Sequence, residues 1–371
     1  MCKKSIKWVM NMPLSQITAY NVGHGDCLLL KFFDGDKESF LLLDCGSTRP
    51  QDDKLKEKWE EKWKDIANDI AGQLRDCKCD EISFMLTHFH KDHYNGFYEV
   101  YNCLEEHRIT LNTFYSTAFV SIEKNGDPDQ DTFVDFLSLI RYRPIVTISS
   151  NQSANLIDKA MKILWPPVPY SLSNLVEYFI KYVPEIKNFL TIYMEQHGIN
   201  DISLFATNED ENSKSLVFEV DGVNNQKYLF AGDLSNQLIL SYYLSQQNSP
   251  GYFSQYINEF NIIDYSTSSI SGKYKMVKMP HHGKEKWPIE KQLLIENGYT
   301  LVSMGEYSLL EGQKLVFSQF PNVIATNYTE NYTNPPWTNV FKIQIDISSQ
   351  GDTVSFSEET NKSKLKYYKT F

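Results

Sequence analysis

The sequence has little of three things: positive charge, long apolar runs and paired cysteines. The 371-residue chain carries 47 acidic and 36 basic side chains, giving a formal net charge of −11. This charge disfavours broad coating of nucleic acid, which needs a positive surface field, although a local basic groove remains compatible with it. No apolar run approaches the roughly 18 residues that cross a bilayer, and Lys7, Asn11 and Pro13 break any signal-type apolar core. We therefore expect a soluble cytoplasmic protein with no membrane association.

The six cysteines all lie in the first third of the chain, and they form no two CxxC pairs of the zinc-finger type. Cys77 and Cys79 are compatible with a redox or metal pair, but a single CxC is a weak signal. We favour reduced structural thiols in a reducing compartment.

Apolar residues are plentiful, at 42% of the chain, and their patterning predicts an α/β protein with a sizeable core. Residues 15–47 read as three strands, with a hairpin turn at 34–37. Residues 51–76 predict an amphipathic helix, 81–86 a buried strand, and 215–235 a hairpin. Further strands are expected at 143–149, 274–279, 300–305, 340–347 and 353–357, and helices at 171–190, 236–247 and 288–297. We interpret 1–371 as one domain with an insertion at about 98–205 and a C-terminal extension at about 335–371.

The segment "LTHFHKDHYNGF", residues 86–97, holds three of the eight histidines. His88 and His90 are two apart on an extended segment and point the same way, whereas Asp92 and His93 follow a turn and reach a neighbouring position. Imidazole and carboxylate groups are ligands for zinc, manganese or iron. A polar surface loop or a hydrogen-bonded core histidine is the alternative, but four ligand-type side chains in six positions favour two metal sites.

The second half of the chain repeats this pattern. A strand ends at Asp44 in the first half, and a later strand leads to His88. In the second half a strand leads to Asp233, and a later strand leads to His281 and His282. Two related halves that deliver Asp and His side chains from strand ends would form one site where they meet.

"THFHKDH" resembles the THxHxDH motif of the metallo-β-lactamase fold. In addition, "NVGHGDCLLL", "FLLLDCGS", "ENSKSLVFEVD", "YLFAGD" and "VKMPHHG" occur in the same order as in the branch typified by the DNA-uptake protein ComEC. The resemblance covers about 21–285 and implies a four-layer αββα sandwich built from two related halves. It also implies two divalent metal ions, zinc or manganese.

The resemblance further implies roles for individual residues. One metal would be held by His88 and His90 and the second by Asp92 and His93. Asp233 would bridge them, and His281 or His282 would complete the set. The catalytic groups would be Asp92 and Asp233, while Asp44 would orient a metal-bound histidine.

Two departures from the family pattern concern the same site. Where many members carry a further histidine, this sequence has Asn212; His197 lies outside the recognisable motif. In "NVGHGD", the ComEC-like pattern more often has Asp and Gln where this chain has Asn21 and His24. We expect His24 and Asp26 to line the site or contact substrate, with a plain strand-to-strand turn as the alternative.

Lysines surround the 281–282 histidine pair in an otherwise acidic chain: Lys273, Lys275, Lys278, Lys284 and Lys286. Lysine ammonium groups suit phosphoryl oxygens, although a solvated charged face is an equal alternative. Lys278 and Lys284 are our candidates for substrate contact.

These features predict a metal-dependent phosphodiesterase that acts on DNA, RNA or another phosphate-bearing substrate through water activated by two metals. The alternatives are hydrolysis of small phosphoesters, hydrolysis of lactams, lactones or thioesters, and a non-catalytic binding module. The aromatic segment 327–337 is a candidate docking site for a regulatory protein partner.

Overall fold

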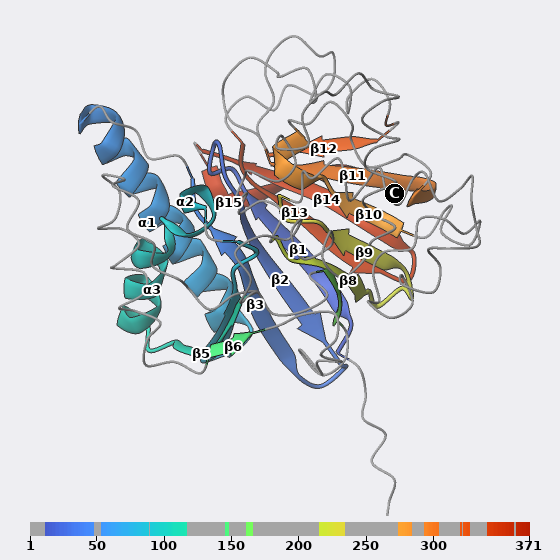
Figure 1. Cartoon of the computed structure of the whole chain (residues 1–371), viewed down its shortest axis with the longest axis horizontal. Coiled ribbons are helices and arrows are strands. Elements are labelled where there is room, and N and C mark those ends of the chain that lie inside the picture. Colours follow the sequence, from blue (N-terminus) through green and yellow to red (C-terminus); the bar gives the residue numbers. More distant parts are fainter. Residues whose placement is uncertain are drawn as a thin grey trace, which may run out of the picture.

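The computed structural model describes part of the chain in detail. The described residues are 12–47, 53–88, 90–116, 145–147, 161–165, 215–233, 274–283, 293–303, 320, 322–326, 340–359 and 361–371. They form a mixed α/β structure with two mixed sheets and few helices (Figure 1). This confirms the predicted α/β class.

The first sheet has the strand order β15-β14-β13-β1-β2-β3-β4-β5-β6. Its strands are β1 (Leu14–Tyr20), β2 (Cys27–Phe33), β3 (Glu38–Cys45), β4 (Glu81–Met85), β5 (Thr110–Ser116), β6 (Ile145–Thr147), β13 (Val340–Ser348), β14 (Gly351–Glu358) and β15 (Asn361–Thr370). The hairpin turn expected at 34–37 is confirmed, because β2 and β3 pair antiparallel around it. The last three strands extend this sheet from β1, so β13, β14 and β15 belong to its hydrogen-bonded ladder.

The second sheet has the order β12-β11-β10-β9-β8-β7. Its strands are β7 (Met161–Trp165), β8 (Val217–Asp221), β9 (Lys227–Phe230), β10 (Tyr274–Lys278), β11 (Leu294–Val302) and β12 (Val323–Ala325). From β7 to β12 the pairings are antiparallel twice and then parallel three times. The same series runs from β1 to β6. The repeat of Asp and His motifs therefore coincides with a repeat of strand pairing.

Apolar side chains between the two sheets form the main core. Leu28, Leu30 and Leu41 of the first sheet share one buried cluster with Phe218 and Phe230 of the second. Since alternate residues of a strand face opposite sides, Leu29 and Leu42 instead join a second cluster on the outer face of the first sheet. The two sheets thus pack face to face.

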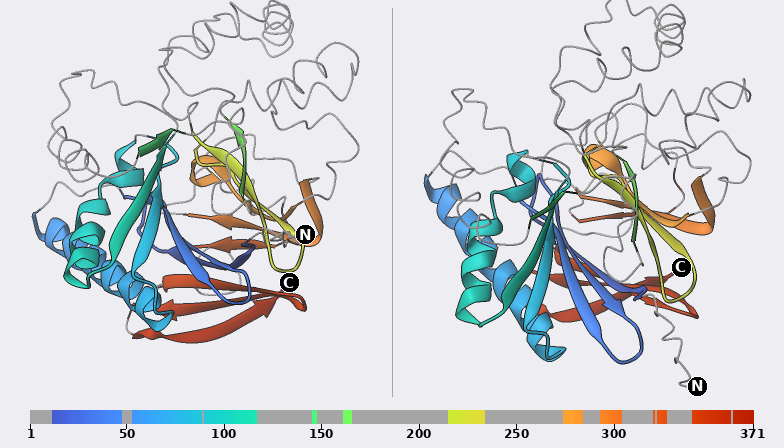
Figure 2. Two further views of the ribbon diagram at one scale, coloured as in Figure 1. Left: turned by 90° about the horizontal axis from the view of Figure 1, so that it is seen from below. Right: turned by 60° about the horizontal axis from the view of Figure 1, so that its bottom comes forward.

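Helices cover the outer face of the first sheet (Figure 2). These are α1 (Asp53–Asp76), the short α2 (Lys91–Tyr94) and α3 (Phe97–Glu106). The amphipathic pattern explains α1, because Trp63, Ile66, Ile70 and Leu74 fall on one face and are all buried in the second cluster. The described residues therefore form a helical layer and two sheet layers.

One predicted element is wrong. The helix expected at 288–297 overlaps β11, which begins at Leu294 and runs parallel to β10. Asn297 has a left-handed backbone conformation with φ 63°, and Gly298 follows it, which suits an irregular strand better than a helix. Pairing with β10 overrides the local helix preference.

Several expectations fall outside the described residues: the helices at 171–190 and 236–247 and the docking segment at 327–337. Of the region 98–205, the described parts supply most of α3 and strands β5, β6 and β7. Among the helices that the structure describes, none has both the length and the apolar composition to cross a membrane.

Candidate metal centre

Several of the candidate site residues lie where parallel strands end. Asp44 lies near the end of β3 and His88 follows β4, while Asp233 follows β9 and His282 follows β10. In each sheet the two strands are parallel neighbours, so their carboxyl ends lie at the same edge. The two edges meet, because His93 lies against Asp233.

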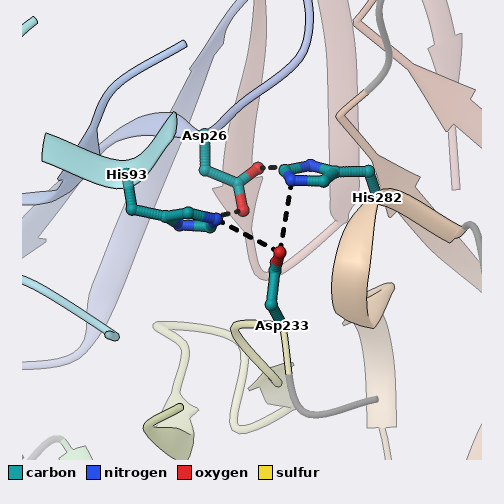
Figure 3. A group of neighbouring side chains, drawn as sticks. All are labelled: Asp26, His93, Asp233 and His282. Atoms are coloured by element: carbon teal, nitrogen blue, oxygen red, sulfur yellow. Dashed lines mark ion pairs between the residues drawn. The ribbon is translucent and has the colours of Figure 1, made fainter. Parts of the chain in front are cut away.

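Two imidazoles converge on one carboxylate oxygen at this meeting point (Figure 3). The Asp233 Oδ2 atom lies 3.2 Å from His93 Nε2 and 3.3 Å from His282 Nε2. His93 and His282 are completely buried, and Asp233 is nearly so. One histidine comes from each half of the chain, so the cluster depends on both sheets.

Each ring faces a further carboxylate through its other nitrogen. His93 Nδ1 lies 2.9 Å from Asp44 Oδ2, and His282 Nδ1 lies 3.7 Å from Asp26 Oδ1. A carboxylate at Nδ1 favours a proton there and leaves Nε2 available for a metal. Asp44 therefore contacts His93, one of the candidate ligands named from the sequence.

Asp44 also contacts the loop that carries the first histidine pair. Its carboxylate accepts hydrogen bonds from the Thr87 backbone N–H at 2.7 Å and from the Thr87 hydroxyl at 2.8 Å. The same hydroxyl lies 3.1 Å from His88 Nδ1. Since the hydroxyl proton is donated to Asp44, the oxygen accepts from His88 Nδ1–H, which leaves His88 Nε2 unprotonated. Thr87 is the first residue of "THFHKDH", but no pattern in the sequence indicated its contact with Asp44.

His88 and His90 lie beside the cluster. His88 Nε2 is 3.1 Å from His90 Nδ1, and the ring centroids of His88 and His93 are 4.1 Å apart. Burial, together with His93, holds the pKa of His88 well below its usual value. His88 is therefore neutral at neutral pH, as a metal ligand must be.

The structure distinguishes the two histidines that follow β10. His282 is buried and faces Asp233 and Asp26, whereas His281 is half-buried. Both have left-handed backbone conformations, with φ of 47° for His281 and 55° for His282. Such conformations cost about 1–3 kcal/mol each and persist only where the surroundings hold them. Here the left-handed backbone at both residues directs the His282 side chain toward Asp233 and Asp26.

Lys278 lies inside the centre instead of on its rim. It is 2% exposed, its ammonium group forms an ion pair with Asp26, and it lies 3.9 Å from Asp233 Oδ1. Burial disfavours its charge, but Asp26 and Asp233 outweigh burial and raise its pKa. The charge of Lys278 thus neutralises that of Asp26. Lys275 is also buried, and its ammonium group contacts the Asn297 carbonyl.

The same opposing influences set the charges of the cluster. Burial alone lowers the pKa of His93, but Asp233 and Asp44 outweigh it and hold that pKa well above its usual value. At His282, Asp233 and Asp26 outweigh burial and raise the pKa. Burial raises the pKa of Asp233, but His282 and His93 bring it well below its usual value. The cluster therefore holds imidazolium–carboxylate pairs that a divalent cation would replace, with release of protons.

The donor set fits a metal ion. Ligands of a tetrahedral zinc site, with bonds of about 2.0–2.1 Å, lie about 3.3–3.4 Å apart, close to the separations of Asp233 Oδ2 from the two Nε2 atoms. Among the described residues, Asp26 Oδ1, Asp233 Oδ1 and His93 Nε2 are buried without a hydrogen bond, although each lies within 3.9 Å of a group of opposite charge. The buried set Asp26, His93, Asp233 and His282 could thus bind a metal ion. Because Asp26 faces the Nδ1 sides of the rings and pairs with Lys278, we interpret it as a supporting group.

Not every predicted residue joins this buried set. Asp92 lies beside the buried set. Its Oδ2 atom is 3.6 Å from His282 Nε2, the nitrogen that also faces Asp233, and it forms a second group with His24 and His282. Asn212 and Lys284 lie outside the described residues, as do Lys273 and Lys286. Comparison with protein-family models and with curated proteins found no match for the chain.

Proposed function

We propose that the chain is a metal-dependent hydrolase of the metallo-β-lactamase type, with a four-layer αββα sandwich, and that it cleaves phosphodiester bonds. One observation carries the proposal: His93 and His282, one from each half, direct Nε2 at Asp233 while a carboxylate faces each ring from behind. Charged and polar side chains are rarely buried at such density without a bound ion. The repeated strand pairing supports the proposed fold.

The metals would be held by His93, His282 and Asp233, with His88 and His90 beside them. When bound, divalent ions supply Lewis acidity that polarises the scissile group and activates water. The buried carboxylates Asp26 and Asp44 orient the imidazoles, and Lys278 neutralises Asp26. These groups keep the ligands in place before substrate arrives, which is what catalysis by electrostatic preorganisation requires.

Asp92 is the group best placed to exchange protons with solvent. Its side chain is 19% exposed, whereas Asp26, Asp44 and Asp233 are at most 2% exposed. Burial would raise its pKa, but His282 and His93 outweigh burial and lower it, so Asp92 is ionised at neutral pH. A proton that leaves the reacting group would reach solvent through this side chain.

The phosphodiester assignment is supported by the ordered motifs of the ComEC-like branch. Lys275 and Lys278 are buried, with their ammonium groups against the Asn297 carbonyl and Asp26. Of the lysines around the histidine pair, Lys284 remains our candidate for a phosphate contact. Substitution Lys284→Ala would then raise KM for a phosphodiester and leave kcat nearly unchanged.

The test uses purified full-length protein whose metal content is measured by elemental analysis. It is assayed with Mn²⁺ and Zn²⁺ against single- and double-stranded DNA, RNA, a generic phosphodiester and a β-lactam. We expect phosphodiester turnover that is lost in Asp233→Asn and retained in the matched control Asp346→Asn, whose carboxylate binds Gln16 in the first sheet. Turnover that survives Asp233→Asn would refute the mechanism, and turnover of the lactam alone would assign the site to acyl transfer.

A further inference from the structure

The loop between β1 and β2 brings a histidine to the solvent side of the metal centre. Ligand atoms of His24, Asp92 and His282 all lie within 4.8 Å of one another. The ring centroids of His24 and His282 are 5.1 Å apart. This outer group contains two imidazoles and a carboxylate, the ligand types of catalytic zinc and manganese sites.

Backbone contacts hold this loop against Asp92. The Asp26 N–H donates to the Asp92 carbonyl at 3.2 Å, and the Gly46 N–H donates to the Asp26 carbonyl at 3.0 Å. Gly25 has φ 150°, and a Cβ atom there would overlap the Gly46 and Asp92 carbonyl oxygens. At the start of the loop, the Asn21 side chain donates to the Val340 carbonyl at 2.8 Å. His24 is therefore carried between two anchored points, close to Asp92.

The exposure of the group suits a reactive metal. His282 is fully buried, whereas Asp92 and His24 are half-buried. Three protein ligands with a solvent-facing side leave positions open for water or substrate, as catalytic zinc sites do. The inner groups Asp233 and His93 are closed to solvent by comparison.

We propose that His24, Asp92 and His282 form an outer metal site with His24 as a direct ligand. The proposal rests on the metal binding of the proposed function and adds a ligand at a position where the ComEC-like pattern more often has Gln. A ring nitrogen binds one ion, so His282 Nε2 serves the outer ion and leaves His93 to the inner one. Asp233, which lies next to both rings, can contribute to either ion.

The test is a ligand substitution with a spectroscopic readout. His24→Cys places a thiolate at the same position, and metal-stripped protein is then titrated with Co²⁺. We expect a sulfur-to-cobalt charge-transfer band in the near ultraviolet that is absent from the wild type and from His24→Ser, which matches cysteine in size. A side chain that only positions its neighbours would not produce this band.

A second variant tests affinity. In His24→Gln, calorimetric titration with Zn²⁺ should show one ion bound at least about tenfold more weakly, the lower end of the cost known for loss of a supporting group. Circular dichroism checks that each variant is folded. Absence of the cobalt band in folded His24→Cys, or wild-type zinc binding in His24→Gln, would overturn the proposal.

The outcomes also separate this proposal from the proposed function. A cobalt band together with a wild-type protein that cleaves none of the assayed substrates would support the outer site and refute the hydrolase. Phosphodiester turnover in the wild type without a cobalt band in His24→Cys would support the hydrolase and refute the outer site.

Discussion

Substitution Asp44→Asn should impair metal binding even though Asp44 itself need not touch the metal. The carboxylate accepts three hydrogen bonds, two from Thr87 and one from His93 Nδ1. Because Oδ1 accepts the Thr87 backbone N–H, the new amide group must keep its oxygen there. Its NH₂ group then replaces Oδ2 and faces the Thr87 hydroxyl and His93 Nδ1 as a donor.

The replacement of an acceptor by a donor at this position changes the protonation of two candidate ligands. His93 Nδ1 must now accept, so the imidazolium loses its Nδ1 proton and keeps the one on Nε2, which faces Asp233. The Thr87 hydroxyl, which accepts from the amide, turns its proton toward His88 Nδ1, and the proton of His88 moves to Nε2. Metal binding then requires both rings to return to the other tautomer at the expense of about two hydrogen bonds.

The expected cost is about 1–3 kcal/mol, taking about 0.5–1.5 kcal/mol for each hydrogen bond. Since 1.4 kcal/mol is a factor of ten in affinity, zinc should bind roughly 10–100-fold more weakly, as found for other groups that support metal-bound histidines. Isothermal titration of metal-stripped protein with Zn²⁺ measures this change. Asparagine tolerates the left-handed conformation of Asp44, with φ 52°, so the fold should be retained.

The matched control is Asp352→Asn. Asp352 is also fully buried and accepts hydrogen bonds from Tyr228, Tyr299 and Asn224, but it touches no histidine of the site. The Asp352→Asn substitution should lower the free energy of unfolding and leave the zinc affinity unchanged. A folded Asp44→Asn protein whose zinc affinity is within about twofold of the wild type would refute the tautomer argument.

Three further predictions concern stability. Lys278→Met should destabilise the metal-stripped protein by about 3–5 kcal/mol in urea unfolding, because it leaves the buried Asp26 carboxylate unpaired. The double variant with Asp26→Asn should recover part of the lost stability. A double variant as unstable as Lys278→Met alone would contradict the ion-pair explanation. Gly96→Ala should lower the free energy of unfolding by about 1–3 kcal/mol, because the new Cβ would overlap the Trp63 ring. A Cβ at Gly72, inside α1, meets nothing within 4 Å, so Gly72→Ala should raise the free energy of unfolding by about 0.5–1 kcal/mol. Equal effects of the two substitutions in thermal unfolding would contradict this packing. Zinc at a hundredfold excess over Kd should stabilise the wild type by about 2.7 kcal/mol, and a thermal midpoint that does not respond to zinc or to a chelator would contradict metal binding by the folded state.

Local patterns in the sequence were sufficient to predict most described elements. The apolar runs of residues 15–47 led to three strands and the hairpin turn, and the spacing of Trp63, Ile66, Ile70 and Leu74 led to α1. These are properties of neighbouring residues. The expected helix at 288–297 failed because pairing of Leu294–Val302 with β10 is a contact with a distant segment, and β15 was not predicted because a lysine-rich edge strand lacks an apolar alternation.

For the site, the sequence by itself determined which residue types gather at strand ends: the histidines of 88–93, Asp44, Asp233 and the 281–282 pair. Only the tertiary structure decided which atoms face one another. Left-handed backbone conformations at His281 and His282 bring His282, and not His281, into the buried set. The Lys278 ammonium group pairs with Asp26. Asp92 and His24 form a second group with His282, outside the buried set. The physical reason is that strand periodicity specifies a face and an edge, whereas the packing of two sheets specifies which side chains from distant segments meet at that edge.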